Sequence, residues 1–145
     1  MATTSWTDDV FETLRTRGSR SGSARSAIVE LLGRQDCCLT ALQIFDGLRA
    51  EGKAVGIASV YRVLESLVEL RVVQQVAVGD GQIRFEPAHR SGEHHHHVVC
   101  DGCGKVESFE DPNLEQALHQ VEARIGYRVA AHEVVLHGAC AACAD

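Results

Sequence analysis

The chain has 145 residues, enough for one domain of usual size or two small ones, and a composition of 45% hydrophobic and 23% charged residues that is typical of a globular protein. No apolar run approaches the roughly 20 residues of a membrane-spanning helix. The N-terminus lacks the basic start and the apolar core of a signal peptide. We therefore expect a cytoplasmic location and no membrane partner. The net charge of −6 does not exclude nucleic acid, because residues 1–86 carry a net charge of only −1 and residues 87–145 carry −5.

Three helices and a hairpin are predicted in the first half of the chain. Apolar residues recur at helical spacing over 23–34. A second helix would begin after the N-cap Thr40 and end near Gly52, and a third is predicted from about Ala58 to Leu70. Two β-rich runs around a Gly-Asp-Gly turn then predict a hairpin. This order is the winged helix-turn-helix pattern, in which the last helix enters the DNA major groove.

The composition changes at residues 87–93, PAHRSGE, which indicates a hinge. We therefore expect an α+β protein with a winged-helix domain over 1–86 and a second domain over 94–145. In this second domain the patterns predict a histidine strand over 94–99, a strand near 105–109, a helix from Pro112 ended by Gly126, and a last strand over 127–138.

Four cysteines form two Cys-x-x-Cys pairs at the two ends of this second domain. Two thiolates from each pair can complete a tetrahedron around one metal. Thiols are kept reduced in the cytoplasm, so such pairs indicate metal ligands before disulfides. Reduced cysteines or a redox pair are the alternatives. The pattern predicts a closed structural Zn²⁺ site on Cys100, Cys103, Cys140 and Cys143.

The run of four histidines directly precedes the first cysteine pair. Successive side chains of a strand point to opposite faces. His94 and His96 would then face one side, and His95 and His97 the other. The strand hypothesis thus predicts two pairs of ligands for two metal sites, whereas a loose metal-binding tract is the alternative.

Three segments in this order, GIASVYRVLESL, HHHHVVCDGCGKV and HGACAAC, resemble the ferric uptake regulator family of metal-dependent repressors. The resemblance covers about residues 14–143. It implies an N-terminal winged helix, a C-terminal α/β dimerisation domain, a homodimer, and binding to palindromic, A·T-rich DNA operators when the sensed metal is bound. We expect no enzymatic activity. A zinc hydrolase needs an open metal position, and no H-E-x-x-H or H-x-E motif is present; a metal buffer without DNA activity is a second alternative.

The resemblance also implies two sites besides the cysteine site. It places a second site on His94, His96, Glu115 and His132. It places the sensing site on Glu86, His89, His95 and His97, with Cys38 as a further candidate, although a buried free cysteine is often only a small hydrophobe. Cys38 stands where iron- and peroxide-sensing members carry a histidine, and Gln75 where some zinc sensors carry an aspartate. Such mixed ligands favour Zn²⁺ as the sensed metal, with Fe²⁺, Mn²⁺, Ni²⁺ or peroxide sensing as alternatives.

DNA contacts are expected from the start of the third helix and from a basic residue ahead of the first. Ser59, Tyr61 and Arg62 lie at the start of the third helix. A tyrosine can pack on a thymine methyl group, and an arginine can bond guanine through two donors. The resemblance assigns the Tyr-Arg pair to DNA and places Arg20 in the minor groove, where narrow A·T-rich grooves favour arginine.

Overall fold

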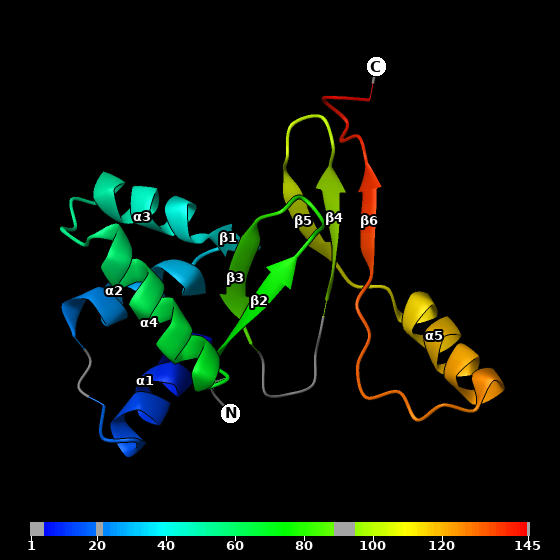
Figure 1. The fold of residues 1–145 in the computed structure, drawn as a ribbon, viewed down its shortest axis with the longest axis horizontal. Coiled ribbons are helices and arrows are strands. Elements are labelled where there is room, and N and C mark those ends of the chain that lie inside the picture. Colours follow the sequence, from blue (N-terminus) through cyan, green and yellow to red (C-terminus); the bar gives the residue numbers. More distant parts are fainter. Residues whose placement is uncertain (1–4, 20–21, 89–94, 145) are drawn as a thin grey trace. The chain divides into compact units, whose positions relative to one another are not determined.

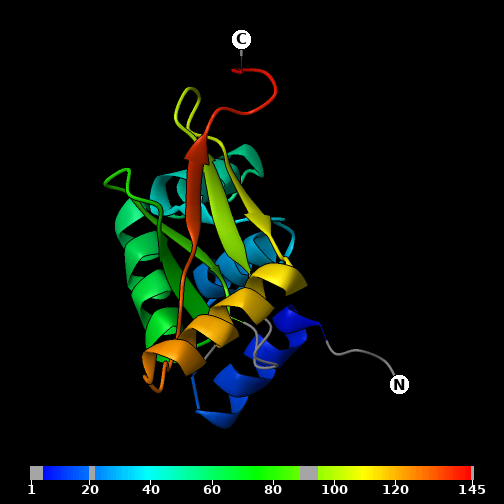
Figure 2. The same ribbon diagram turned by 90° about the vertical axis from the view of Figure 1, so that its right-hand side faces the viewer.

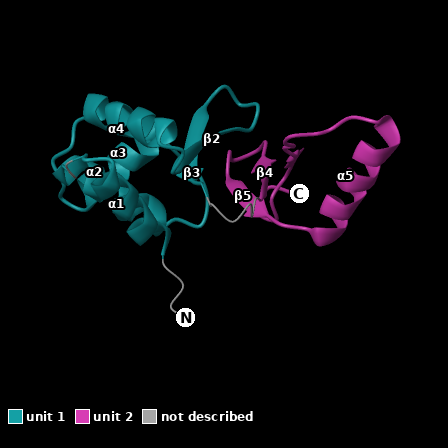
Figure 3. Ribbon diagram, turned by 90° about the horizontal axis from the view of Figure 1, so that it is seen from below, with its two compact units in different colours: residues 1–93 teal, residues 94–145 magenta. Residues whose placement is uncertain are grey.

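The computed structural model describes residues 5–19, 22–88 and 95–144. The chain divides into two compact units, Met1–Glu93 and His94–Asp145 (Figure 3), and each has its own three-stranded sheet. Arg20, His89 and His94, which the sequence analysis assigns to DNA or metal, lie outside the described residues.

The described residues of the first unit form four helices and an antiparallel sheet, which lie beside each other (Figure 1). The helices are α1 (Trp6–Thr16), α2 (Ser23–Gly33), α3 (Ala41–Ala50) and α4 (Ile57–Glu69). The strands are β1 (Leu39–Thr40), β2 (Val73–Ala77) and β3 (Ile83–Pro87), in the order β1-β3-β2. The helices of residues 23–34, 40–52 and 58–70 and the hairpin were all predicted from the sequence, whereas α1 and β1 were not.

Helix α1 packs on the rest of this unit through a short apolar stripe. Val10 and Leu14, one turn apart, are each 1% exposed, and the indole Nε1 of Trp6 donates to the carbonyl oxygen of Val72 at 2.9 Å. Ser5 begins the helix, since its hydroxyl accepts from the N–H of Asp8. A stripe of two buried residues is too short to stand out as a period in the sequence.

Thr40 joins the sheet to the core helices of this unit. It ends β1 and is the N-cap of α3. Its hydroxyl accepts from the N–H of Gln43 at 3.1 Å, and its own N–H donates to the Gln43 side chain at 2.9 Å, so the two residues form a capping box. Behind it lies the hydrophobic core, which includes Ile28, Leu32, Ile44, Leu48, Val60, Leu64, Leu67 and Phe85.

Within residues 95–144, the second unit has one helix and a mixed sheet (Figure 2). Its elements are β4 (His96–Cys100), β5 (Val106–Phe109), α5 (Pro112–Ile125) and β6 (Val135–Gly138). The strand order is β5-β4-β6, with β4 antiparallel to β5 and parallel to β6. Parallel neighbours need a long crossover connection, and α5 lies within it.

The last strand is shorter than predicted. Residues 127–134 form no strand, and β6 pairs with β4 only from His97↔Val135 to Cys100↔Gly138. Since β4 itself begins at His96, only Val134 among these residues has a β4 residue opposite it in this register, and its N–H donates to the His96 ring instead. The placement of His132 on the last strand was therefore wrong, because it precedes the strand by three residues. The predicted histidine strand starts at residue 94, outside the described residues, and His95 is not part of β4, which begins at His96.

Helix α5 is amphipathic but buries none of its residues. Asp111 begins it by accepting from the N–H groups of Asn113 and Leu114, and Gly126, at φ 71°, ends it. On this helix, Val121 is 37% exposed and Ile125 54% exposed. Among the described helices of both units, none combines the length and the hydropathy that a bilayer crossing requires.

Candidate metal centres and nucleic-acid interface

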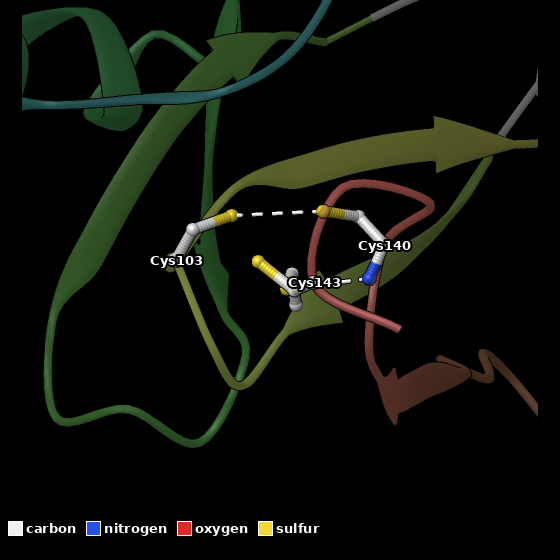
Figure 4. A group of neighbouring side chains, drawn as sticks. Cys103, Cys140 and Cys143 are labelled. Carbon is white, nitrogen blue, oxygen red and sulfur yellow. Dashed lines mark hydrogen bonds between the residues drawn. The ribbon is translucent and has the colours of Figure 1, made fainter. Parts of the chain in front are cut away.

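The four cysteines of the two Cys-x-x-Cys pairs come together at one end of the second unit. Their sulfur atoms all lie within 4.8 Å of one another, and Cys103 Sγ is 3.9 Å from Cys140 Sγ (Figure 4). A tetrahedral Zn²⁺ with Zn–S bonds of about 2.3 Å separates neighbouring sulfurs by about 3.8 Å. The sulfur spacing and the donor type therefore fit a closed zinc site on Cys100, Cys103, Cys140 and Cys143.

Backbone contacts hold the two cysteine turns against each other. The N–H of Cys140 donates to Cys100 Sγ at 3.3 Å, and the N–H of Asp101 donates to the carbonyl of Gly138 at 2.8 Å. A Cβ at position 102 would lie 3.2 Å from Cys143 Sγ, tighter than an ordinary van der Waals contact, so the close approach of the turns favours Gly102.

The same contacts set the protonation of the thiols. Backbone N–H groups, first that of Cys140 and then that of Cys103, lower the pKa of Cys100 to about 6. Hydrogen bonding with the other thiols, first that of Cys140, raises the pKa of Cys143 to about 12. Of these two thiols, Cys100 is thus the more easily deprotonated. Four thiolates together need a cation to offset their charge.

A second group of metal-type side chains lies at the other end of β4, near the start of α5. The Nε2 of His96 donates to Glu115 Oε1 at 2.5 Å, and Glu115 Oε2 lies 2.8 Å from His132 Nε2. One ligand atom from each residue lies within 4.8 Å of the other two. Imidazole and carboxylate ligands at this spacing suit Zn²⁺ and other divalent transition metals. His94, the fourth predicted member, is outside the described residues.

The other ring nitrogen of His96 has a donor as its partner. The backbone N–H of Val134 donates to His96 Nδ1 at 3.2 Å. Because an N–H can only donate, Nδ1 accepts, and the ring proton is on Nε2 facing Glu115. A metal-binding histidine usually donates from its second nitrogen instead. The residues fit a metal in type and spacing, and a cation at Nε2 would require the ring proton to leave that atom.

His95 and His97 lie near each other, away from this group. Their ring centroids are 5.1 Å apart, whereas His96 stacks with His132 at 5.4 Å. Neighbouring histidines of the run therefore have different surroundings, as the alternation of a strand predicts.

Glu86, a candidate ligand of the sensing site in the first unit, lies on β3 of the wing. Glu86 is opposite Gln74 in the β2–β3 register, and its carboxylate accepts from Gln74 Nε2 at 2.6 Å. Gln75, which the sequence analysis singled out, is opposite Phe85. The sequence pattern gave no reason to prefer Gln74, because only the strand register separates the two glutamines.

Cys38 directly precedes β1, whose Leu39 is opposite Phe85 on β3. Its sulfur is 3.6 Å from that of Cys37. Hydrogen bonding with Cys37, burial, and the nearby charge of Glu86 raise the pKa of Cys38 far above its usual value. The thiol is therefore protonated at neutral pH unless a cation displaces the proton.

The candidate DNA-binding residues occupy the solvent side of α4. Val60, Leu64 and Leu67 are 0% exposed on the opposite side, while Tyr61 is 50% exposed. The Arg62 guanidinium donates to Ser59 Oγ at 3.1 Å. The helix thus presents a phenol ring and a guanidinium together, the groups that can contact thymine methyls and guanine edges.

The sequence and the structure both match known metal-dependent regulators. The model of the "Ferric uptake regulator family" matches residues 16–137. The chain belongs to the ferric uptake regulator family. It is 31% identical to the ferric uptake regulation protein of Bacillus subtilis over 94% of this chain and 93% of that protein. The solved Vibrio cholerae ferric uptake regulator is 29% identical with a TM-score of 0.79, covering 91% of this chain and 100% of that one.

A further relative bears on the metal sites. The Helicobacter pylori regulator, with a TM-score of 0.82 and 26% identity over 97% of this chain and 93% of that one, is described as having three functional metal binding sites. Membership confirms the fold class, an N-terminal winged helix with a C-terminal dimerisation domain. The chain is a metal-responsive regulator of transcription and, like its relatives, not an enzyme.

Proposed function

We propose that this member of the ferric uptake regulator family is a zinc-responsive repressor. It acts in the cytoplasm as a homodimer that binds palindromic, A·T-rich operators when its sensing site is loaded. The observation that supports zinc as the sensed metal is the thiol of Cys38, which directly precedes β1, the strand that pairs with the Glu86 strand β3. Iron-sensing members carry a histidine at the position of Cys38. A mixed sulfur, nitrogen and oxygen donor set suits Zn²⁺ better than the harder Mn²⁺.

Each metal site has a separate role in this proposal. The site of Cys100, Cys103, Cys140 and Cys143 holds a structural Zn²⁺, because four thiolates leave no open position. The site of His94, His96, Glu115 and His132 supports the dimerisation domain. The sensing site takes Glu86, His89, His95 and His97, with Cys38 as a fifth candidate. It draws on the winged-helix domain of residues 1–86, the hinge of residues 87–93 and the dimerisation domain of residues 94–145.

The response follows from where these ligands lie in the sequence. Ligands from both sides of the hinge satisfy one ion only in a restricted set of domain arrangements. The bound ion therefore favours arrangements in which two α4 helices match successive half-sites of an operator. The gain in DNA affinity is limited by the difference in metal affinity between the competent arrangement and the others.

The homodimer is supported by the surface of α5. Its apolar stripe comprises Leu114, Ala117, Leu118, Val121 and Ile125, and no residue of the helix is buried. In the same unit, Tyr127 and Leu136 are 74% and 50% exposed. An apolar surface of this kind in a family of dimers is best covered by a second copy of the chain.

Iron sensing is the second candidate. The relative at 31% identity is a ferric uptake regulation protein, and the histidines and Glu86 suit Fe²⁺ as well as Zn²⁺. The test is operator binding measured against buffered free Zn²⁺, Fe²⁺, Mn²⁺ and Ni²⁺. Zinc sensing is supported if half-maximal operator binding needs a lower free concentration of Zn²⁺ than of the other three ions, by more than the usual affinity order of these metals gives. Activation by Fe²⁺ with little response to Zn²⁺ overturns it.

A further inference from the structure

Gln74 contacts the carboxylate that the proposed sensing site uses on the wing. Its amide Nε2 donates to Glu86 Oε1 at 2.6 Å, from the directly opposite position on β2. We propose that Gln74 is a positioning and specificity residue of the sensing site. It fixes the direction of the Glu86 carboxylate and, being neutral, keeps the strand pair at a single negative charge at this position. This inference rests on the proposed function, which makes Glu86 a ligand.

The register of the wing makes this contact specific to Gln74. Directly opposite residues of an antiparallel pair lie on one face of the sheet, close enough for their side chains to bond. Gln75 is opposite Phe85, so its side chain starts on the other face. The two glutamines have the same chemistry and adjacent positions, and only one is placed to hold Glu86.

Between β2 and β3, the described hydrogen bond to Glu86 comes from a neutral amide. Arg84, two residues before Glu86 on β3, forms an ion pair with Asp80 of the wing turn, at 2.8 Å. On the other side of β3, Cys38 precedes the strand β1. Glu86 therefore lies between an amide donor on β2 and a thiol ahead of β1. A hydrogen bond from a neutral donor orients the carboxylate without cancelling the charge that attracts a cation.

Two substitutions separate orientation from charge. Q74L removes the donor and keeps a side chain of similar size. Loss of the hydrogen bond that orients a ligand typically lowers metal affinity by about 10- to 100-fold. We therefore expect Q74L to need about 10- to 100-fold more free Zn²⁺ for half-maximal operator binding. Q74E replaces the amide by a second carboxylate. Carboxylates suit harder ions, so the preference for Zn²⁺ over Mn²⁺ is expected to fall by about tenfold.

The experiment uses the full-length protein with its structural zinc in place. Operator binding is followed by fluorescence anisotropy against buffered free Zn²⁺ and, separately, Mn²⁺, for the wild type, Q74L, Q74E, E86Q and the matched control Q75L. Zinc content and circular dichroism before titration establish that each variant is folded. If Gln74 positions Glu86, Q74L needs more free Zn²⁺ for half-maximal operator binding than the wild type. Q74E has a smaller preference for Zn²⁺ over Mn²⁺, measured as the ratio of the two midpoints, and Q75L behaves as the wild type.

The variants distinguish failure of this inference from failure of the sensing site. If E86Q loses the Zn²⁺ response while Q74L and Q74E keep wild-type midpoints and ratio, Glu86 is a ligand and Gln74 does not position it. If Q75L shifts as far as Q74L, the effect is a general one of the strand and the inference is again wrong. If E86Q itself responds as the wild type does, Glu86 is no ligand, and both the proposed sensing site and the role of Gln74 are overturned.

Discussion

The guanidinium of Arg62 donates a hydrogen bond to the hydroxyl of Ser59, one turn earlier on α4, at 3.1 Å. The two residues are on the exposed side of the helix, next to Tyr61. A guanidinium has five N–H donors, so this bond restrains the side chain and leaves donors for a base edge. The free protein thus holds Arg62 in a limited range of directions before DNA is bound.

Substitution of Arg62 by alanine should weaken operator binding by about 1–3 kcal/mol and relax the preference at one base pair of each half-site, as expected for a base contact. Competition binding with a set of singly substituted operators at fixed salt measures both effects. Arg49→Ala, which removes an exposed arginine from α3, is the matched control. Equal, sequence-independent weakening by both variants would mean that Arg62 contributes charge and not base recognition.

Substitution of Cys103 by serine should unfold the second unit and not merely change the metal response. The binding energy of a closed thiolate site is folding energy, on the order of 10 kcal/mol for structural zinc in small peptides. Zinc analysis and size-exclusion chromatography should show the loss of one zinc per chain and of the dimer. Cys37→Ser, in the first unit, should change neither. Mild chelation of the wild type should abolish DNA binding with the structural zinc retained. A folded Cys103→Ser dimer with wild-type zinc content would contradict the structural role.

The histidines of β4 should divide into two classes. His97→Ala and His95→Ala are expected to abolish metal-dependent DNA binding with the structural zinc retained. His96→Ala should instead reduce dimer stability and leave part of the metal response, because His96 contacts Glu115 and His132 within the second unit. DNA-binding titrations and thermal unfolding separate the classes. Similar, mild effects of all three substitutions, with unchanged metal stoichiometry, would favour a loose metal-binding tract.

The surface of α5 predicts where the dimer can be broken. Ile125→Glu places a charge in the exposed apolar stripe, and light scattering should show a shift from dimer to monomer at micromolar concentration. Gln120→Glu adds the same charge outside the stripe and should leave the dimer intact. A dimeric Ile125→Glu protein would show that this stripe is not the interface.

The capping box of α3 should contribute measurably to stability. Thr40→Ala removes the acceptor for the N–H of Gln43 and should lower the free energy of unfolding by about 0.5–2 kcal/mol. Urea unfolding of the zinc-loaded protein measures the change. Thr40→Ser keeps the hydroxyl and should stay close to the wild type. If alanine and serine at this position gave equal stability, the box would not stabilise the helix.

Local signals predicted most of the fold. Thr40 and Gly52 predicted the two ends of α3 through N-cap and C-cap preferences, which depend only on neighbouring residues. The run of histidines continuing into Val98 predicted a strand. The misses arose where pairing or packing decides. The composition of residues 127–134 predicts a strand, but in the β4–β6 register only Val134 has a β4 residue opposite it. Similarly, Gln74 differs from Gln75 only through the β2–β3 register, which the sequence does not display.

The hydrogen bond from Val134 to His96 also has a chemical consequence for the site of His96, Glu115 and His132. A cation that binds at Nε2 needs its lone pair, so the proton there must leave or move to Nδ1. A proton on Nδ1 would face the Val134 N–H, and two donors repel. Binding of an ion at Nε2 therefore requires that this hydrogen bond be given up, either by a turn of the imidazole ring or by a shift of residues 132–134.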